Sequence, residues 1–306
     1  MQNSTIIKWI YTKYIIKFLK MKIYLLILSS ILIITSCDKV EGPYITDPDS
    51  YINPDKKVLI EDFTGHLCTN CPGAAREISA IHDLYGDQII ALAIHTSTDF
   101  ARPYSASQTG FQYDFRTKWG EEWDNIFGAS AIGLPRGMVN RIGGQSPTLG
   151  KNEWAAVVAN ELQKEIRFKI NISSNTESIT VTSDIVKNTN GSFNLVICLV
   201  ESNIINWQKD GAVNVEDYEH NHVLRSVLID NAISSSTNFV VGEQIVNTIE
   251  YDLTTLEQFN EDYSSDADEG NGNAGGWDAT NMSIIAFIYN TNTNEVVQVE
   301  EANLNQ

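Results

Sequence analysis

The sequence predicts an α/β domain followed by an all-β domain, and three observations lead to this prediction. Two short apolar runs, at 58–63 and 88–95, flank a segment with helical spacing at 72–85. This order is typical of a strand, a helix and a second strand. Beginning near residue 167, seven segments alternate apolar and polar residues. The change of period predicts one domain at 58–166 and a second at 167–306.

Composition excludes one class of partner. The 306 residues include 21 Lys and Arg against 39 Asp and Glu, and the net charge is −18. Proteins that bind nucleic acids need a basic face to neutralise phosphates. We therefore expect no nucleic-acid partner. The four cysteines are too few for a disulfide scaffold, so each is assigned separately.

The N-terminal segment has the features of an export signal. Residues 1–36 hold five lysines and no acidic residue, and an apolar stretch at 23–34 follows a lysine. This pattern predicts a signal peptide at 1–36 whose true start is Met21. Residues 34–37, Ile-Thr-Ser-Cys, resemble the lipobox of bacterial lipoproteins. The resemblance implies a lipid on Cys37, which would anchor the mature chain to a membrane.

A tether is predicted between the anchor and the first domain. Residues 37–57 contain three prolines among polar and acidic residues and show no apolar period. Such a segment has too little apolar surface to form a core. We therefore expect a lipidated tether at 37–57, with the folded domains attached to the membrane through the lipid.

A Cys-x-x-Cys pair lies where the first strand turns into the helix. Cys68 and Cys71 come between the apolar run at 58–63 and the helical segment at 72–85. The free N–H groups of a helix N-terminus stabilise a thiolate, so the first cysteine is predicted to attack and the second to resolve the mixed disulfide. Half of a zinc site has the same spacing, but the sequence has no second pair to complete it.

Two further positions make this domain resemble thioredoxin. Asp62 lies six residues before Cys68, and the segment 132–135 is Ile-Gly-Leu-Pro. In thioredoxin a buried carboxyl at the first position moves protons to and from the second cysteine, and a cis-proline at the second faces the disulfide. The resemblance implies a thioredoxin-like fold over 58–166, a proton relay at Asp62 and a substrate-holding role for Pro135.

The segment at about 97–131 is an aromatic insertion into this domain. It is longer than the minimal fold needs and contains eight Phe, Tyr and Trp residues. One interpretation is a rim that faces a substrate near the disulfide. A small helical subcore that covers the edge of the sheet is the favoured interpretation.

Residues 167–306 predict an antiparallel β-sandwich of immunoglobulin-like topology, with a jelly roll as the alternative. Cys198 lies within an apolar strand, where we expect a buried and unreactive thiol. The candidate strands are 167–173, 178–186, 193–201, 222–230, 245–253, 281–290 and 296–302.

Two groups of side chains were considered as metal sites. His220-Asn221-His222 has no evident third ligand, so a polar motif at the start of a strand is favoured over a metal. Calcium is the weaker interpretation of the acidic residues around the glycine-rich loop 270–276, and a solvated loop is the favoured one. We therefore expect no metal, and no cofactor beyond a redox-active Cys68–Cys71 disulfide. The acidic residues in question are Asp266, Asp268 and Asp278.

From the lipobox to its end the chain resembles the twenty-eight-kilodalton outer-membrane lipoproteins of Bacteroidetes. The motifs that carry the resemblance lie at 61–72, 217–225 and 281–290. The resemblance implies a thioredoxin-like domain joined to a β-sandwich. It also implies an exported lipoprotein of the outer membrane, on its periplasmic or its surface side.

Two classes of function follow from these features. The first is a thiol–disulfide oxidoreductase that acts on exported proteins or with a redox partner in the envelope, using Asp62, Cys68, Cys71 and Pro135. The second is a surface adhesin or receptor without catalysis, in which the disulfide is structural. Fold alone does not decide between them.

Overall fold

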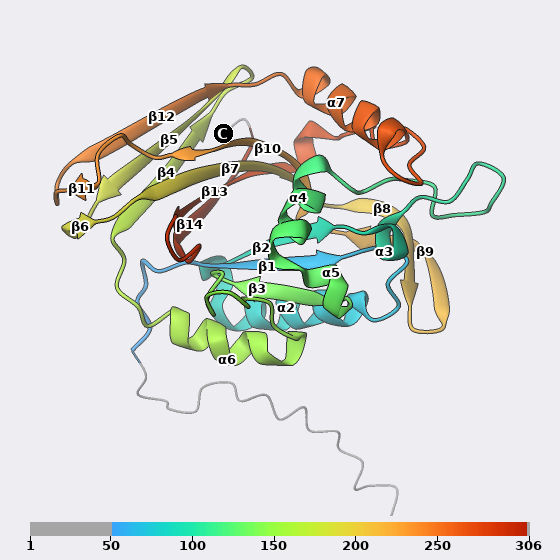
Figure 1. Ribbon diagram of the computed structural model, residues 1–306, viewed down its shortest axis with the longest axis horizontal. Helices are drawn as coiled ribbons and strands as arrows, with labels where there is room; N and C mark the ends of the chain where they lie inside the picture. Colours follow the sequence, from blue (N-terminus) through green and yellow to red (C-terminus); the bar gives the residue numbers. More distant parts are fainter. Residues whose placement is uncertain (1–50, 305–306) are drawn as a thin grey trace, which may run out of the picture. The chain divides into compact units, whose positions relative to one another are not determined.

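A seven-stranded mixed sheet organises the protein (Figure 1). The computed structural model describes residues 51–304. The predicted signal peptide, Cys37 and most of the predicted tether lie outside this range. Among the described residues, no helix is long and apolar enough to cross a membrane.

The first half of the chain supplies three neighbouring strands of the sheet. β1 (Val58–Thr64) and β2 (Ile89–His95) run parallel, and β3 (Arg136–Val139) pairs antiparallel with β1. Helix α2 (Cys71–Tyr85) connects β1 to β2. The predicted strand, helix and second strand are therefore present, in the order that the apolar runs indicated.

The second half of the chain extends the same sheet. β10 (Val223–Ala232) lies beside β2, and the complete order is β14-β13-β7-β10-β2-β1-β3. The other three strands are β7 (Phe193–Glu201), β13 (Met282–Asn290) and β14 (Val296–Asn303). Pairs within this half are antiparallel, whereas β10 meets β2 in parallel at Val223 and Ala93.

This topology corrects the predicted immunoglobulin-like sandwich over 167–306. All seven candidate strands are present, but four of them continue the sheet of the first half, so the change of period near 167 does not separate two sheets. The alternation of a strand shows which of its faces is buried, but it does not show which strand lies at its edge. The sequence pattern therefore located the strands and misassigned their partners.

A smaller sheet packs on one face of the large one. It has the order β12-β5-β4, with β4 (Phe168–Ser174), β5 (Ser178–Ile185) and β12 (Gln244–Glu250). Its inward side chains share an apolar cluster with alternate residues of β7 and β13, including Leu199 and Ile284. A two-stranded pair, β6 (Thr189–Asn190) with β11 (Asn238–Phe239), lies at its end.

Helices cover both faces of the strands from the first half (Figure 1). On one face, α2 and α6 (Lys151–Glu161) pack on Val58 and Ile60 of β1. On the other face, Trp123 and Ala129 pack on Leu59 and Phe63. These two residues belong to the insertion, which forms α3 (Thr98–Ala101), α4 (Lys118–Phe127) and α5 (Ala129–Ile132).

Besides β6 and β11, one helix and one hairpin were not predicted from the sequence. Helix α7 (Leu253–Asp266) begins at Asp252, whose carboxylate accepts a hydrogen bond from Thr255 N at 2.7 Å. A hairpin of β8 (Ile204–Asp210) and β9 (Val213–His220) follows β7. Short 3₁₀ turns at Gly86–Gln88 and Ala279–Asn281 complete the secondary structure.

A buried ion pair joins β1 to the turn after β3. Arg141 Nη2 donates to Glu61 Oε1 at 2.7 Å, and Arg141 Nε donates to Oε2 at 2.9 Å. Both side chains are buried. The guanidinium also lies 5.0 to 5.4 Å from the centres of four aromatic rings, a distance at which cation–π attraction adds to the pair. These rings belong to Trp123, Phe127, Phe287 and Tyr289.

Removing one partner of this pair is expected to destabilise the fold strongly. Arg141→Met leaves Glu61 as an uncompensated buried charge, which costs about 3–5 kcal/mol of unfolding free energy. The double variant Arg141→Met/Glu61→Leu should recover much of that loss. The control is Lys118→Met, which breaks an exposed pair with Glu122 worth at most about 0.5 kcal/mol. Urea unfolding measures all three, and equal losses for Arg141→Met and Lys118→Met would contradict the assignment.

Candidate functional site

The two cysteines form a disulfide at the N-terminus of α2. Cys68 Sγ is bonded to Cys71 Sγ, and Cys71 is the first residue of the helix. The preceding loop is tight, because a Cβ at Gly65 would lie 2.2 Å from the carbonyl oxygen of Phe100. Both cysteines are buried, with exposed fractions of 3% and 2%.

The β8–β9 hairpin covers the cysteine loop. The side chain of Gln208 and two backbone amides of the hairpin bind carbonyl oxygens of the loop. The bonds are Gln208 Nε2 to Cys68 O at 3.1 Å, Lys209 N to His66 O at 2.9 Å and Gly211 N to Thr69 O at 2.8 Å. Sequence reasoning missed these contacts. The Asp210-Gly211 pair was the available signal of a hairpin in the sequence, and Gly211 has the positive φ of 58° that such turns require.

Asp62 lies on β1 with its carboxyl buried. Its exposed fraction is 4%, and its Oδ1 has no hydrogen-bond partner. Burial raises the pKa of Asp62 well above its usual value, because an ionised carboxylate loses its hydration without gaining a partner. This carboxyl therefore keeps its proton to a higher pH than an exposed aspartate does.

A cavity of about 410 Å³ lies between α2 and the end of β9. Its lining includes Asp62 and Cys71, so the structure brings the carboxyl and the second cysteine to one space. Cys68 does not line it.

Four histidines also line this cavity, and three of them have a buried ring nitrogen without a partner. The atoms are Nδ1 of His95, Nε2 of His220 and Nδ1 of His222. Burial lowers all three pKa values, that of His220 to about 3, so the rings are neutral at pH 7. His220 ends β9 and Val223 begins β10, which agrees with a motif at the start of a strand.

Pro135 lies in the loop that opens β3. The Leu134–Pro135 peptide bond is cis, as the resemblance to thioredoxin implied. Leu134 is buried in the same apolar cluster as Cys68 and Cys71. The structure therefore brings this loop close to the disulfide.

The aromatic insertion is largely a subcore. Phe111 and Phe115 are buried, and Phe115 stacks on His95 with ring centres 4.7 Å apart. Phe111 packs edge-on against His66, in the cysteine loop. This burial agrees with the favoured interpretation of the insertion and leaves these two rings unable to form a substrate-facing rim. Cys198 is a buried free thiol, and burial raises its pKa.

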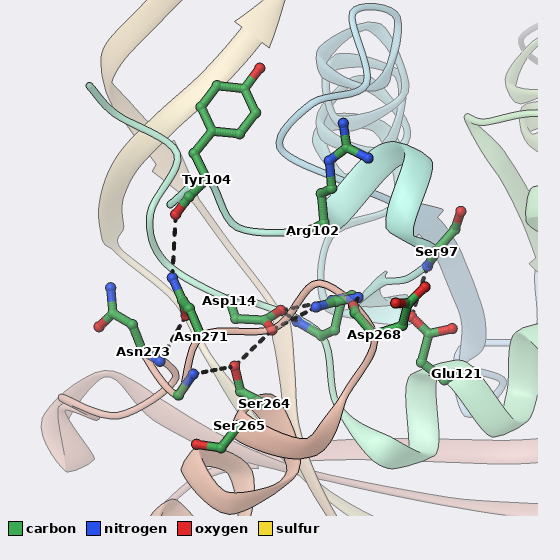
Figure 2. Close-up of polar contacts among 12 residues, drawn as sticks. Ser97, Arg102, Tyr104, Asp114, Glu121, Ser264, Ser265, Asp268, Asn271 and Asn273 are labelled. Carbon is green, nitrogen blue, oxygen red and sulfur yellow. Dashed lines mark hydrogen bonds and ion pairs between the residues drawn. The ribbon is translucent and has the colours of Figure 1, made fainter. Parts of the chain in front are cut away.

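Hydrogen bonds join the end of α7 and the glycine-rich loop after it to the insertion (Figure 2). Asp114 accepts hydrogen bonds from Arg116 and Ser264, and Asn271 donates to Tyr104 O at 3.4 Å and to Gln112 O at 2.9 Å. Within residues 51–304, no group of three His, Cys, Asp or Glu side chains has metal-binding geometry. The loop is held by hydrogen bonds to the insertion, and calcium at Asp266, Asp268 and Asp278 stays the weaker prediction from the sequence.

Comparison with known proteins gives a family match and a likeness of fold. Residues 121–266, a little under half of the chain, match the model of the family described as outer membrane protein Omp28. HBP35 of Porphyromonas gingivalis superposes with a TM-score of 0.55 at 16% identity, over 82% of this chain and 76% of that one. At this identity the likeness concerns the fold alone. No curated protein matches the chain.

Two other solved structures are more distant. A protein from Agrobacterium tumefaciens has a TM-score of 0.49 at 11% identity, over 82% of this chain and 95% of that one. A domain of the outer membrane lipoprotein Omp28 from Porphyromonas gingivalis has a TM-score of 0.25 at 21% identity, over 46% of this chain and 91% of that one. Neither superposition is close enough to support an argument.

Replacing Asp62 with Asn should stabilise the protein increasingly as the pH rises. The raised pKa means that the folded state holds a proton which the unfolded chain releases above about pH 4, so the wild type loses stability as the pH rises toward the folded pKa. D62N lacks this titration. Urea unfolding between about pH 4 and pH 8 measures the difference, with D83N at an exposed position of α2 as the control. A difference that does not change with pH would contradict the buried carboxyl.

Proposed function

We propose that this chain, which matches the Omp28 family model over residues 121–266, is an outer-membrane lipoprotein of the cell envelope and that it carries out thiol–disulfide exchange there through Cys68 and Cys71. The proposal treats the β1-α2-β2 unit, with its disulfide at the start of α2 and Pro135 in the neighbouring loop, as a thioredoxin-like site. Its substrates would be disulfides or thiols of the envelope.

The observation that carries the proposal is the buried carboxyl of Asp62 in the same cavity as Cys71. A carboxyl buried without a partner costs stability, and a disulfide that only staples a loop has no use for one. Reduction of a disulfide releases a thiolate that must take up a proton. A carboxyl that keeps its proton beside the disulfide can supply that proton to the thiolate. Acids with a raised pKa are often found near reactive groups for this reason.

The surroundings of the pair support the same conclusion. Among the described residues, the titratable side chains with a buried unpaired polar atom are Asp62, His66, His95, His220 and His222. His66 belongs to the cysteine loop, and the other four line the cavity. Elsewhere in the described chain, buried charged side chains are paired or hydrogen-bonded, as in Arg225 with Glu201 at 2.8 Å and Lys56 Nζ with Val297 O at 2.7 Å. Unpaired titratable groups therefore gather around one disulfide.

The chemistry moves two electrons. A thiolate attacks one sulfur of the Cys68–Cys71 bond, a mixed disulfide forms, and the other cysteine leaves as a thiolate and takes a proton. A second thiol then attacks the mixed disulfide, which releases the oxidised partner and leaves a dithiol. The attacking role of Cys68, the resolving role of Cys71 and the substrate-holding role of Pro135 remain predictions from the sequence.

A structural disulfide in a receptor or adhesin is the second candidate function. The observation that favours it is the burial of both cysteines under the hairpin, because a sulfur that a partner cannot reach does not exchange. The two candidates predict different reduction potentials, since structural disulfides lie below about −300 mV and thioredoxin-type pairs lie near or above about −270 mV.

The proposed exchange predicts a readily reducible disulfide. Equilibration of the purified protein with thiol buffers of known potential should reduce Cys68–Cys71 at or above about −270 mV. D62N should lower the rate of exchange near neutral pH and leave the fold intact. Cys198→Ala is the control and should exchange like the wild type. A pair that stays oxidised below about −300 mV, with no exchange, would support the structural disulfide instead.

The lipid anchor is proposed from the sequence, because Cys37 lies outside the described residues. Cys37→Ser should release the protein from the membrane fraction, since a lipid on this residue would be its attachment. Cys198→Ser, a change at the buried thiol, should stay with the membranes. Membrane fractionation and the mass of the N-terminal peptide test this. Unchanged membrane association with an unprocessed N-terminus would refute it.

A further inference from the structure

The cavity beside the disulfide reaches one sulfur-bearing residue of the pair and not the other. Cys71 lines it and Cys68 does not. We propose that this cavity is a binding site for a low-molecular-weight thiol, which exchanges with the disulfide by attacking Sγ of Cys71. The inference rests on the proposed exchange function and identifies its substrate class and its route of access. It reverses the roles that the sequence predicts for the two cysteines, because Cys71 carries the mixed disulfide and Cys68 is the leaving sulfur.

The approach to Cys68 is closed by the hairpin. Gln208 Nε2 donates to Cys68 O at 3.1 Å and to Gly65 O at 3.3 Å. Arg76 of α2 and Asp210 of β8 form an ion pair at 2.9 Å over the same region. The hairpin is thereby held over the loop that carries Cys68. Cys68 is 3% exposed and does not line the cavity.

The approach to Cys71 is open through the cavity. Its lining includes Ala75 and Ser79 on the exposed side of α2 and Asn221 after β9, all of them exposed. It also includes Asp62 and Cys71, which are buried. The space therefore leads from solvent to the second cysteine. Its volume of about 410 Å³ suits a small molecule and excludes a folded domain.

The lining indicates a thiol that also carries an amine. No Lys or Arg lines the cavity, whereas the carboxylates of Glu219 and Glu301 do. The ring nitrogens of His220 and His222 that lack partners are on neutral imidazoles, which accept or donate hydrogen bonds without repelling a cation. An aminothiol such as cysteamine satisfies these groups, while an acidic thiol such as mercaptoacetate meets two like charges.

The small thiol is the reductant in this exchange, and it supplies both electrons. The thiolate of the first molecule bonds to Cys71 Sγ, the bond between Cys71 and Cys68 breaks, and Cys68 leaves as a thiolate. The Cys68 thiolate takes up the proton that the entering thiol released. Asp62, which lines the cavity together with Cys71, is the proton donor when Cys71 leaves in the second step. A second thiol attacks the mixed disulfide, so that two thiols become one disulfide and the protein becomes a dithiol.

The test measures how fast small thiols reduce the oxidised full-length protein. Each rate is divided by the rate at which the same thiol reduces free cystine, which corrects for its intrinsic reactivity. On this scale cysteamine should react faster than mercaptoacetate. Ala75→Trp and Ser79→Trp block the open side and should slow cysteamine by about tenfold or more. Both positions are exposed on α2 and tolerate a large side chain. Asp83→Trp, exposed on the same helix and outside the cavity, is the matched control and should stay near the wild-type rate.

Single-cysteine variants identify the sulfur that is attacked. Native Cys68→Ala protein treated with cystamine should acquire one cysteamine on Cys71, found by peptide mass spectrometry. Native Cys71→Ala protein should leave Cys68 unmodified until denaturant is added.

Three results would overturn the inference, and they distinguish a wrong route of access from a wrong exchange function. If cysteamine bonds to Cys68, or if both tryptophan variants react like the wild type, the route through the cavity is wrong and the exchange function still stands. If neither small thiols nor a protein dithiol such as reduced thioredoxin reduces the pair, the exchange function fails and this inference fails with it.

Discussion

The contact between β2 and β10 determines how the groups around the cysteine pair are arranged. Ala93 N donates to His222 O at 2.8 Å, and Val223 pairs with Ala93 in parallel. Through this pairing of β2 with β10, the strands of the second half of the chain continue the sheet that the first half forms. It also holds the end of β9 beside β2, so His220 and His222 come to line the same cavity as Cys71. The other part of the hairpin is held over the cysteine loop by Gln208, Lys209 and Gly211.

Two adjacent residues of β1 show how the protein treats buried charge. Glu61 and Asp62 point to opposite faces of the sheet, because side chains alternate along a strand. Glu61 is paired with Arg141 inside a ring of aromatic side chains, whereas Asp62 has an unpaired oxygen beside Cys71. An ion pair offsets part of the desolvation free energy of a buried charge, whereas an unpaired carboxylate has no such compensation. The proposed exchange uses the face on which Asp62 lies.

The insertion and the C-terminal part of the chain support the site together. Phe115 contacts His95 of β2 and His220 of β9, with ring centres 4.7 and 4.6 Å apart. Ser264 of α7 donates to Asp114 of the insertion, and Asn271 in the loop after α7 donates to Tyr104 O (Figure 2). The insertion is thereby packed between elements from both halves of the chain. Its aromatic residues position the histidines, which composition alone did not show.

The sequence by itself determined the local features: the strands, the helix after the CxxC pair, the cis bond before Pro135 and the buried strand around Cys198. These follow from apolar period and from short motifs, which act over a few residues. Only the tertiary structure decided that one sheet contains both halves, that β8 and β9 cover Cys68, and that Cys71 shares a cavity with Asp62. Strand partners and cavities depend on which residues distant in sequence meet, and the alternation of a strand carries no information about its neighbour.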